Sequence, residues 1–214
     1  MAGTTVEDGG QVPAAFEAAF AAHGFAITPT QLTGVRGSSK RDAVRQLLPE
    51  GDGREAMATA VYASFCEGLA RRYTEEGVRA IAGARQTFDW LKGRGVRLAL
   101  NTGFDRSITT LLVSALGWEN EVDAIVCGDE VRQGRPAPYL IFHAMEATGV
   151  TNVQRVANVG DTALDLRAGA NAGVRWNIGV LSGAHGRERL EKEPHTHLLA
   201  SVADVPAAVS AASG

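Results

Sequence analysis

The sequence has few cysteines and no long apolar run. Only two cysteines, Cys66 and Cys127, occur among its 214 residues, and they lie far apart. This spacing excludes a disulfide framework and a cysteine zinc site, and it predicts free thiols in a reducing cytoplasm. No apolar run approaches the roughly 18 residues that would span a bilayer, so no membrane segment is expected.

An excess of positive charge is also absent. The chain has 21 Lys and Arg residues against 24 Asp and Glu residues, a formal net charge of -3. No basic field is therefore present to attract nucleic acid or an anionic membrane. The hydrophobic content of 45% is ordinary for a globular protein. The sequence does not define the oligomeric state and leaves a homodimer open.

The second half of the chain alternates short apolar runs with amphipathic helical patterns at intervals of about 30 residues, as βαβ units do. We predict strands at residues 96–100, 124–127, 156–159 and 176–180. Apolar residues at helical spacing between them can cover both faces of a sheet. The pattern predicts an α/β fold with a parallel sheet.

The region from residue 10 to residue 79 has a different pattern. Phe16 and Phe20, then Val44 and its neighbours, and then the alanine-rich stretch 55–72 all indicate helices, with no convincing strand between them. We therefore predict an all-helical insertion over residues 10–79, within a core formed by residues 1–9 and 80–214.

Chemically useful groups follow three of the predicted strands. Thr102 and Gly103 follow the first strand, Arg135 follows the second, and Asp161 and Asp165 follow the third. Ligands of an open parallel sheet bind at the carboxyl ends of its strands. A hydroxyl, a loop amide and a fixed positive charge suit a phosphate group. The two carboxylates are four residues apart, so we expect them on one helical face, where their hard oxygens suit magnesium.

Each of these signals has an ordinary structural alternative. Thr102 could be a plain helix cap, and Arg135 could be a solvated loop charge. Asp161 and Asp165 could both complement a helix dipole. Their order across one predicted sheet favours a single site over three unrelated features.

At these residues the sequence resembles a known family. Thr102, then Arg135 in GRPAPY, then VGDTALD look like the second, third and fourth motifs of the haloacid dehalogenase superfamily, whose members use an aspartate nucleophile. The opening MAGTTV is similar to the tail of the first motif in the phosphonatase-like branch. The resemblance implies a Rossmann-like core, a helical cap that closes over the site, and hydrolysis of a small phosphorylated substrate through an aspartyl-phosphate.

The resemblance also implies a role for each matched residue. Thr102 and the Gly103 amide would hold the transferring phosphoryl group. Arg135 stands in place of a more usual lysine and would neutralise nucleophile and phosphate. Asp161 would bind Mg²⁺, and Asp165 would bind it directly or through water.

The same resemblance concerns the beginning of the chain. Ala2 would supply a backbone carbonyl to the magnesium, and the nucleophilic aspartate would fall immediately before Met1. The apolar side chains of a central first strand would contribute about 5 to 10 kcal/mol, comparable with the net stability of a typical domain. We therefore expect the natural chain to begin upstream. Without its nucleophile the chain should be nearly inactive, slower by about 10⁴ to 10⁶.

The position of Lys40 is compatible with a further function. In phosphonoacetaldehyde hydrolase a cap lysine forms a Schiff base with the substrate, and Lys40 falls at the matching position, at a predicted helix start. Ala43 and Gly10 replace the accompanying histidine and cysteine, so a phosphate ester is favoured over carbon–phosphorus cleavage with Lys40. A third alternative is a non-catalytic relative that binds phosphometabolites.

Overall fold

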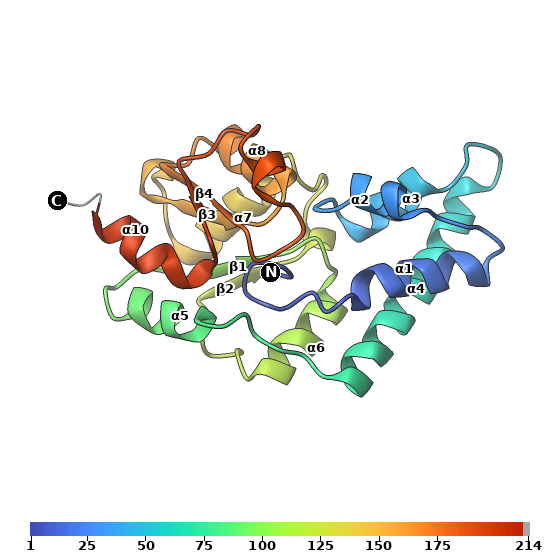
Figure 1. Ribbon diagram of the computed structural model, residues 1–214, viewed down its shortest axis with the longest axis horizontal. Coiled ribbons are helices and arrows are strands. Elements are labelled where there is room, and N and C mark those ends of the chain that lie inside the picture. The colour runs from blue at the N-terminus through green and yellow to red at the C-terminus, as the bar shows by residue number, and fades with distance from the viewer. Residues whose placement is uncertain (212–214) are drawn as a thin grey trace.

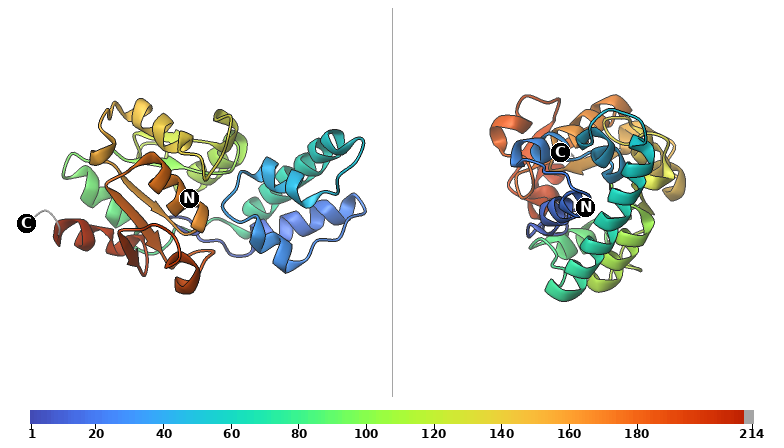
Figure 2. Two further views of the ribbon diagram at one scale, coloured as in Figure 1. Left: turned by 90° about the horizontal axis from the view of Figure 1, so that it is seen from above. Right: turned by 90° about the vertical axis from the view of Figure 1, so that its right-hand side faces the viewer.

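A computed structural model describes residues 1–211, and it forms an α/β lobe and a helical lobe side by side (Figures 1 and 2). The helical lobe is built from the first four helices of the chain. They are α1 (Gln11–Ala22), α2 (Pro29–Gly34), α3 (Lys40–Leu47) and α4 (Arg54–Glu76).

Within residues 1–211, the α/β lobe has five parallel strands in two groups, β1–β2 and β3–β4–β5. The strands are β1 (Ala99–Asn101), β2 (Ala124–Val126), β3 (Ala157–Gly160), β4 (Trp176–Val180) and β5 (His197–Leu199). The prediction of an α/β fold with a parallel sheet is confirmed.

The bounds of β2 and β3 agree with the prediction to within one residue, and two larger differences remain. The first strand begins at Ala99 rather than at residue 96, because the Asp123 carboxylate accepts the Leu98 amide at 2.8 Å in place of a strand partner. The short strand β5 was not predicted. Its sequence, HLL, is too short for a period-2 pattern, and β5 pairs only with β4.

Helices pack on both sides of these strands (Figure 2). They are α5 (Ala84–Lys92), α6 (Arg106–Leu116), α7 (Tyr139–Thr148), α8 (Ala163–Ala172), α9 (Arg187–Leu190) and α10 (Val205–Ala211). Three single 3₁₀ turns complete the lobe: η1 (Gly128–Glu130), η2 (Val153–Arg155) and η3 (Val202–Asp204).

The two groups of strands leave a cavity between β1 and β3. It has a volume of about 1070 Å³ and is lined by β1 on one side and by β3 on the other, with α5, α7 and α10 around it. Met1 lines both this cavity and a second one described below. The amino end of the chain therefore lies at the centre of the α/β lobe.

The helical lobe has an aromatic core that continues into the α/β lobe. Phe16 of α1 and Phe65 of α4 pack with ring centroids 4.3 Å apart. The same buried cluster includes Phe104, Ile108 and Leu112, of which the last two belong to α6. Apolar burial of this kind stabilises the contact between the lobes.

Two exclusions made from composition can be examined in the structure. Within residues 1–211, no helix is both long enough and apolar enough to cross a membrane. Cys66 and Cys127 are both free thiols, as their spacing predicted.

Candidate active site between the two lobes

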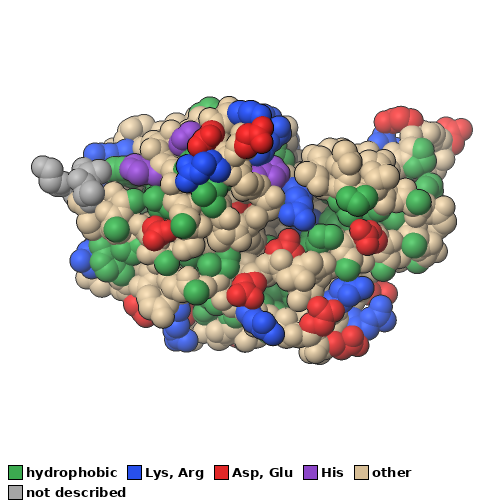
Figure 3. Space-filling model, viewed as in Figure 1, with side chains coloured by type: hydrophobic (Ala, Val, Ile, Leu, Met, Phe, Trp, Pro, Cys, Tyr) green, Lys and Arg blue, Asp and Glu red, His purple; other side chains and the backbone are tan. Residues whose placement is uncertain are grey.

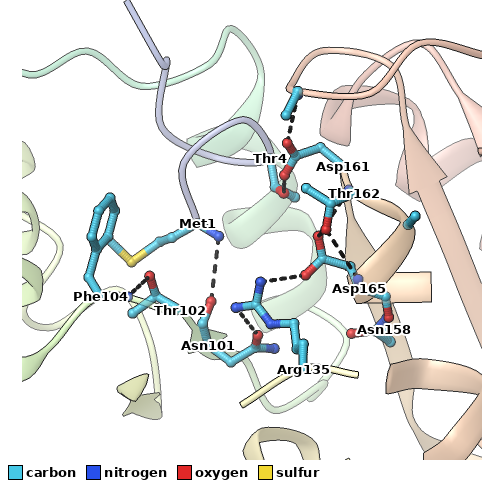
Figure 4. A network of polar contacts seen from close by, with 12 residues as sticks. Met1, Thr4, Asn101, Thr102, Phe104, Arg135, Asn158, Asp161, Thr162 and Asp165 are labelled. Atoms are coloured by element: carbon cyan, nitrogen blue, oxygen red, sulfur yellow. Dashed lines mark hydrogen bonds and ion pairs between the residues drawn. The ribbon is translucent and has the colours of Figure 1, made fainter. Parts of the chain in front are cut away.

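The three predicted strand ends meet at one cavity between the lobes. Thr102 follows β1, Arg135 lies in the loop after β2, and Asp161 follows β3 (Figure 4). The hollow between the lobes carries acidic and basic side chains at its rim (Figure 3). We call this space the site cavity. Its charged lining residues are Asp8, Arg36, Lys40, Arg135, Asp161 and Asp165.

Arg135 and Asp165 form the central ion pair of the cavity. The Arg135 Nη1 lies 2.7 Å from Asp165 Oδ1, and both side chains are about nine-tenths buried, at 9% and 10% exposure. The Arg135 Nη2 donates to Asn101 Oδ1 at 3.1 Å. The Arg135 Nε is buried and has no hydrogen-bond partner within residues 1–211. One donor of this buried guanidinium is therefore left without an acceptor.

Two donors of the α/β lobe hold the Asp161 carboxylate. Its Oδ1 accepts from the Thr4 hydroxyl at 2.7 Å, and its Oδ2 accepts from the Ala184 amide at 2.8 Å. Gly3 has a φ of +81°, and a Cβ built there would lie 2.2 Å from Asp161 Oδ2. Only glycine fits this position, both for its backbone angle and for the space beside the carboxylate.

The expectation that Asp161 and Asp165 share a helical face is wrong. Helix α8 begins at Ala163, after the N-cap residue Thr162, whose side chain accepts the Asp165 amide. Asp161 therefore precedes the helix, and only Asp165 lies in its first turn. The two carboxylates still line one cavity, because Asp161 alone separates the end of β3 from the N-cap (Figure 4).

The two carboxylates differ in acidity. Burial raises the pKa of Asp161, and the nearby Asp165 raises it further. Burial would raise the pKa of Asp165 too, but Arg135 and the Thr162 hydroxyl hold it below the usual value. A buried carboxylate with a raised pKa is one that a cation would stabilise in its charged form.

The donor set also fits magnesium in type. Asp161 and Asp165 bring carboxylate oxygens to the cavity, and Ala2 also lines it. Mg²⁺ is usually held by one or two carboxylates together with water and phosphate. Within residues 1–211 no group of three or more acidic, histidine or cysteine side chains could hold a metal by itself.

Thr102 is buried at the end of β1 and is not a helix cap. The N-cap of α6 is Asp105, whose side chain accepts the Ile108 amide. The Thr102 hydroxyl accepts the Phe104 amide at 3.2 Å, which leaves its own proton free to donate. The Gly103 amide has no acceptor in the described part of the chain. Two free donors thus follow β1 at the cavity.

Lys40 enters the cavity from the helical lobe. Helix α3 begins at Lys40, as the sequence predicted, and the Lys40 amide donates to the Gly103 carbonyl at 3.1 Å across the two lobes. Its ammonium group lies 5.3 Å from the centroid of the Phe104 ring. Burial, followed by the charge of Arg135, lowers the pKa of Lys40 from 10.5 to about 8.

Several residues of the site were not singled out from the sequence. Asn101 orients Arg135, Thr4 binds Asp161, and Arg36 lines the cavity from the helical lobe. Asn101 and Thr4 adjoin recognised motifs, so their position in the sequence was an available signal. No such signal marks Arg36 in the sequence, because an arginine in a loop is usually a solvated charge.

Comparisons with known proteins agree on one family. The family model described as haloacid dehalogenase-like hydrolase matches residues 3–178. A phosphonoacetaldehyde hydrolase from Bacteroides fragilis is 30% identical over 207 residues, which cover 91% of this chain and 78% of that protein.

Solved structures show the same fold. A hydrolase from Pseudomonas syringae superimposes with a TM-score of 0.87 at 20% identity and covers 98% of this chain and 95% of its own. A phosphonoacetaldehyde hydrolase-like protein from Oleispira antarctica superimposes with a TM-score of 0.84 at 22% identity, over 98% of this chain and 89% of its own.

Proposed function

The chain belongs to the haloacid dehalogenase-like hydrolase family, and from this premise we propose that it is a magnesium-dependent phosphohydrolase of small phosphorylated metabolites. The observation that supports this best is the guanidinium of Arg135. Its side chain is only 9% exposed, and its buried Nε has no partner within residues 1–211. A buried donor of this kind needs an acceptor, and a phosphoryl oxygen forms a strong, charge-assisted hydrogen bond with it.

The free donors after β1 complete a phosphoryl-binding arrangement. The Thr102 hydroxyl and the Gly103 amide would donate to two phosphoryl oxygens, while Arg135 would neutralise their charge. Asp161 and Asp165 would hold Mg²⁺. When bound, the ion supplies positive charge to the phosphoryl oxygens as negative charge develops on them.

The attacking group in this proposal is an aspartate carboxylate at the end of the site cavity where Met1 lies, as the resemblance to the family implies. The Met1 nitrogen lies 3.4 Å from the Asn101 carbonyl oxygen, and Met1 lines the site cavity. The carboxylate would attack phosphorus as the bond to the leaving oxygen breaks. Water would then hydrolyse the aspartyl-phosphate and return the carboxylate. The helical lobe would act as the cap that excludes bulk water.

The proposal can be tested by preceding Met1 with an apolar strand of about six residues that ends in aspartate. The matched control ends in asparagine. Hydrolysis of a panel of phosphate esters is measured with and without Mg²⁺. We expect metal-dependent turnover only in the aspartate form, faster by about 10⁴ or more. Equal rates in both forms, or turnover that persists in Asp161→Ala, would contradict the proposal.

A second candidate function is carbon–phosphorus cleavage of a phosphoryl aldehyde through Lys40. The observation that favours it is the position of Lys40 in the cavity together with its pKa of about 8. A neutral lysine amine can condense with an aldehyde, releasing water and forming an imine. The identity to phosphonoacetaldehyde hydrolase of Bacteroides fragilis supports this candidate.

Imine formation can be measured without any nucleophilic aspartate. Phosphonoacetaldehyde is added with borohydride, and peptides are examined by mass spectrometry for reduced adducts. Labelling confined to Lys40 would support the second candidate, and Lys40→Arg serves as the control that keeps the charge without forming an imine. A wild-type protein that binds phosphonates but yields no adduct would eliminate this candidate and leave the first in place.

A further inference from the structure

We propose that the helical lobe carries a second anion site, built on Arg36, which selects phosphoryl compounds that bear another negative charge at their far end. The inference rests on the proposed function, because it places the phosphoryl group at Arg135. It adds the substrate class that the proposed function leaves open.

The loop that carries Arg36 packs closely against the α/β lobe. Gly37, the next residue, has a φ of +90°, and a Cβ built on it would lie 2.5 Å from Thr162 Oγ1. A Cβ built on Gly103 would likewise lie 2.8 Å from the Ser38 carbonyl oxygen. These close approaches hold Arg36 at the cavity, where it is half-buried, rather than in open solvent.

Arg36 has no partner of its own. Within residues 1–211 its guanidinium forms no ion pair and no hydrogen bond. Several other arginines of the chain do bind carboxylates, for example Arg45 with Glu55 and Arg167 with Glu193. Asp8 also lines the cavity but forms no ion pair with Arg36. A half-buried guanidinium that is not paired with a carboxylate can bind the anionic group of a ligand.

Arg36 lies near the part of the α/β lobe that holds the proposed metal ligand. Arg36 and Asp161 both line the site cavity. Gly37, the residue after Arg36, closely approaches Thr162, the residue after Asp161. A ligand whose phosphoryl group lies at Arg135 can therefore reach Arg36 within the same cavity.

The surroundings define the ligand. Lys40 lies in the same wall as Arg36, and apolar side chains of Val12, Phe16 and Leu32 complete it. Positive charge beside an apolar wall favours a ligand with a short apolar linker and an anionic end, because the interaction is stronger in a partly desolvated cavity. A carboxylate or a second phosphoryl group has this chemistry, whereas a neutral aldehyde end would leave Arg36 without an acceptor.

The test compares three phosphonates of equal chain length by calorimetry in the presence of Mg²⁺. Propylphosphonate has no second anion, 3-phosphonopropionate adds a carboxylate, and propane-1,3-bisphosphonate adds a second phosphonate. We expect the wild-type protein to bind one or both doubly anionic ligands at least about tenfold more tightly than propylphosphonate. Arg36→Met should remove that preference and change propylphosphonate affinity less than about twofold. The preferred ligand identifies the second anion.

Two controls keep the result interpretable. Arg41→Met removes a nearby cation that lies over the Tyr62 ring, outside the cavity, and should keep the preference. Arg36→Lys should retain part of it. Equal affinities for all three ligands in the wild-type protein, or an equal loss for all three in Arg36→Met, would overturn the second anion site while the proposed function stands. If no phosphonate binds at all, the proposed function fails instead.

Discussion

The two sides of the site cavity are built in opposite ways. On the α/β side, the charged groups are tied to one another. Asp161 accepts from Thr4 and Ala184, and Asp165 pairs with Arg135. On the helical side, the cations of Arg36 and Lys40 have no carboxylate bonded to them within residues 1–211. One side is held rigid by its own contacts, and the other has charges available to a ligand.

This difference separates two tasks. Groups that stabilise a transition state must be oriented before the reaction, so their side chains are fixed by hydrogen bonds. Groups that choose among substrates need unsatisfied charge and a surface that differs between proteins. The comparison implies that substitutions on the α/β side change the chemistry of the site, whereas those on the helical side change which ligand it accepts.

The largest effect is expected for Asp161→Asn, on the fixed side. The amide keeps the size of the carboxylate but loses its charge, and its NH₂ group would face either the Thr4 hydroxyl or the Ala184 amide, both donors in the native site. We expect Mg²⁺ affinity, measured by calorimetry, to fall by more than about 100-fold. Asp89→Asn, at an exposed position on α5, is the control. If both variants bind Mg²⁺ equally, Asp161 is not a ligand.

A smaller but distinctive effect is expected for the reactivity of Lys40. Its pKa of about 8, lowered from 10.5 mainly by burial, leaves far more neutral amine at pH 7. Reductive methylation should therefore be faster there than at exposed Lys192 by a factor on the order of tens, with half-maximal reactivity near pH 8. Residue-resolved mass spectrometry measures both sites. A reactivity profile centred above pH 10 would show that the amine is solvated.

The lowered pKa of Lys40 also makes the free energy of unfolding depend on pH. Between about pH 8 and 10.5 the unfolded chain binds a proton at Lys40 that the folded protein has released. The stability of the fold should therefore rise with pH across this window through Lys40, and this contribution should be absent in Lys40→Met. The measurement is the free energy of unfolding of both proteins at several pH values.

The fold was more predictable than the details of the site. Strand ends that carry Thr102, Arg135 and Asp161 could be located because apolar runs mark buried strands, and the ends of parallel strands share one edge. The extent of α8 was not predictable from spacing, since Thr162 caps the helix one residue after Asp161. Spacing alone cannot show which residue accepts the first free amide of a helix.

The helical side illustrates what sequence reasoning could not provide. The start of α3 at Lys40 was predicted, and the structure shows Ser39 as the N-cap of this helix. The placement of Arg36 depends on contacts between residues more than a hundred positions apart, such as Gly37 against Thr162. Long-range packing of this kind leaves no periodic pattern in a single sequence.

Gly37→Ala tests whether ligand binding requires close contact between the helical side and the α/β side of the cavity. Alanine is strained at a φ of +90°, and its Cβ would collide with Thr162 Oγ1. We expect the loop to shift and the affinity for 3-phosphonopropionate to fall about tenfold, the equivalent of roughly 1.4 kcal/mol. Gly34→Ala is the matched control, because a Cβ there meets nothing within 4 Å. Unchanged affinity in Gly37→Ala would mean that close contact between the lobes is unnecessary for binding.

The smallest effect is expected for Tyr62→Phe, which removes one polar contact between the lobes. The Tyr62 hydroxyl of α4 donates to Asp105 Oδ2 at 2.7 Å, and Asp105 caps α6. Loss of this bond should destabilise the fold by about 1 kcal/mol, measured by denaturant unfolding, whereas Tyr139→Phe at a 44% exposed position should have almost no effect.

The pH dependence of the destabilisation in Tyr62→Phe shows whether the charge of Asp105 contributes to it. Burial would raise the pKa of Asp105, but hydrogen bonds from the Ile108 amide and from Tyr62 hold it below the usual 3.8. The stabilisation is therefore complete above pH 3.8 and is lost as the pH falls through the lower, folded-state pKa. The difference between wild type and Tyr62→Phe should be constant near neutral pH and shrink in acid. A difference that does not change with pH would indicate that the Tyr62 hydroxyl contributes equally whether Asp105 is charged or protonated, and that this contact between the lobes does not depend on the charge of Asp105.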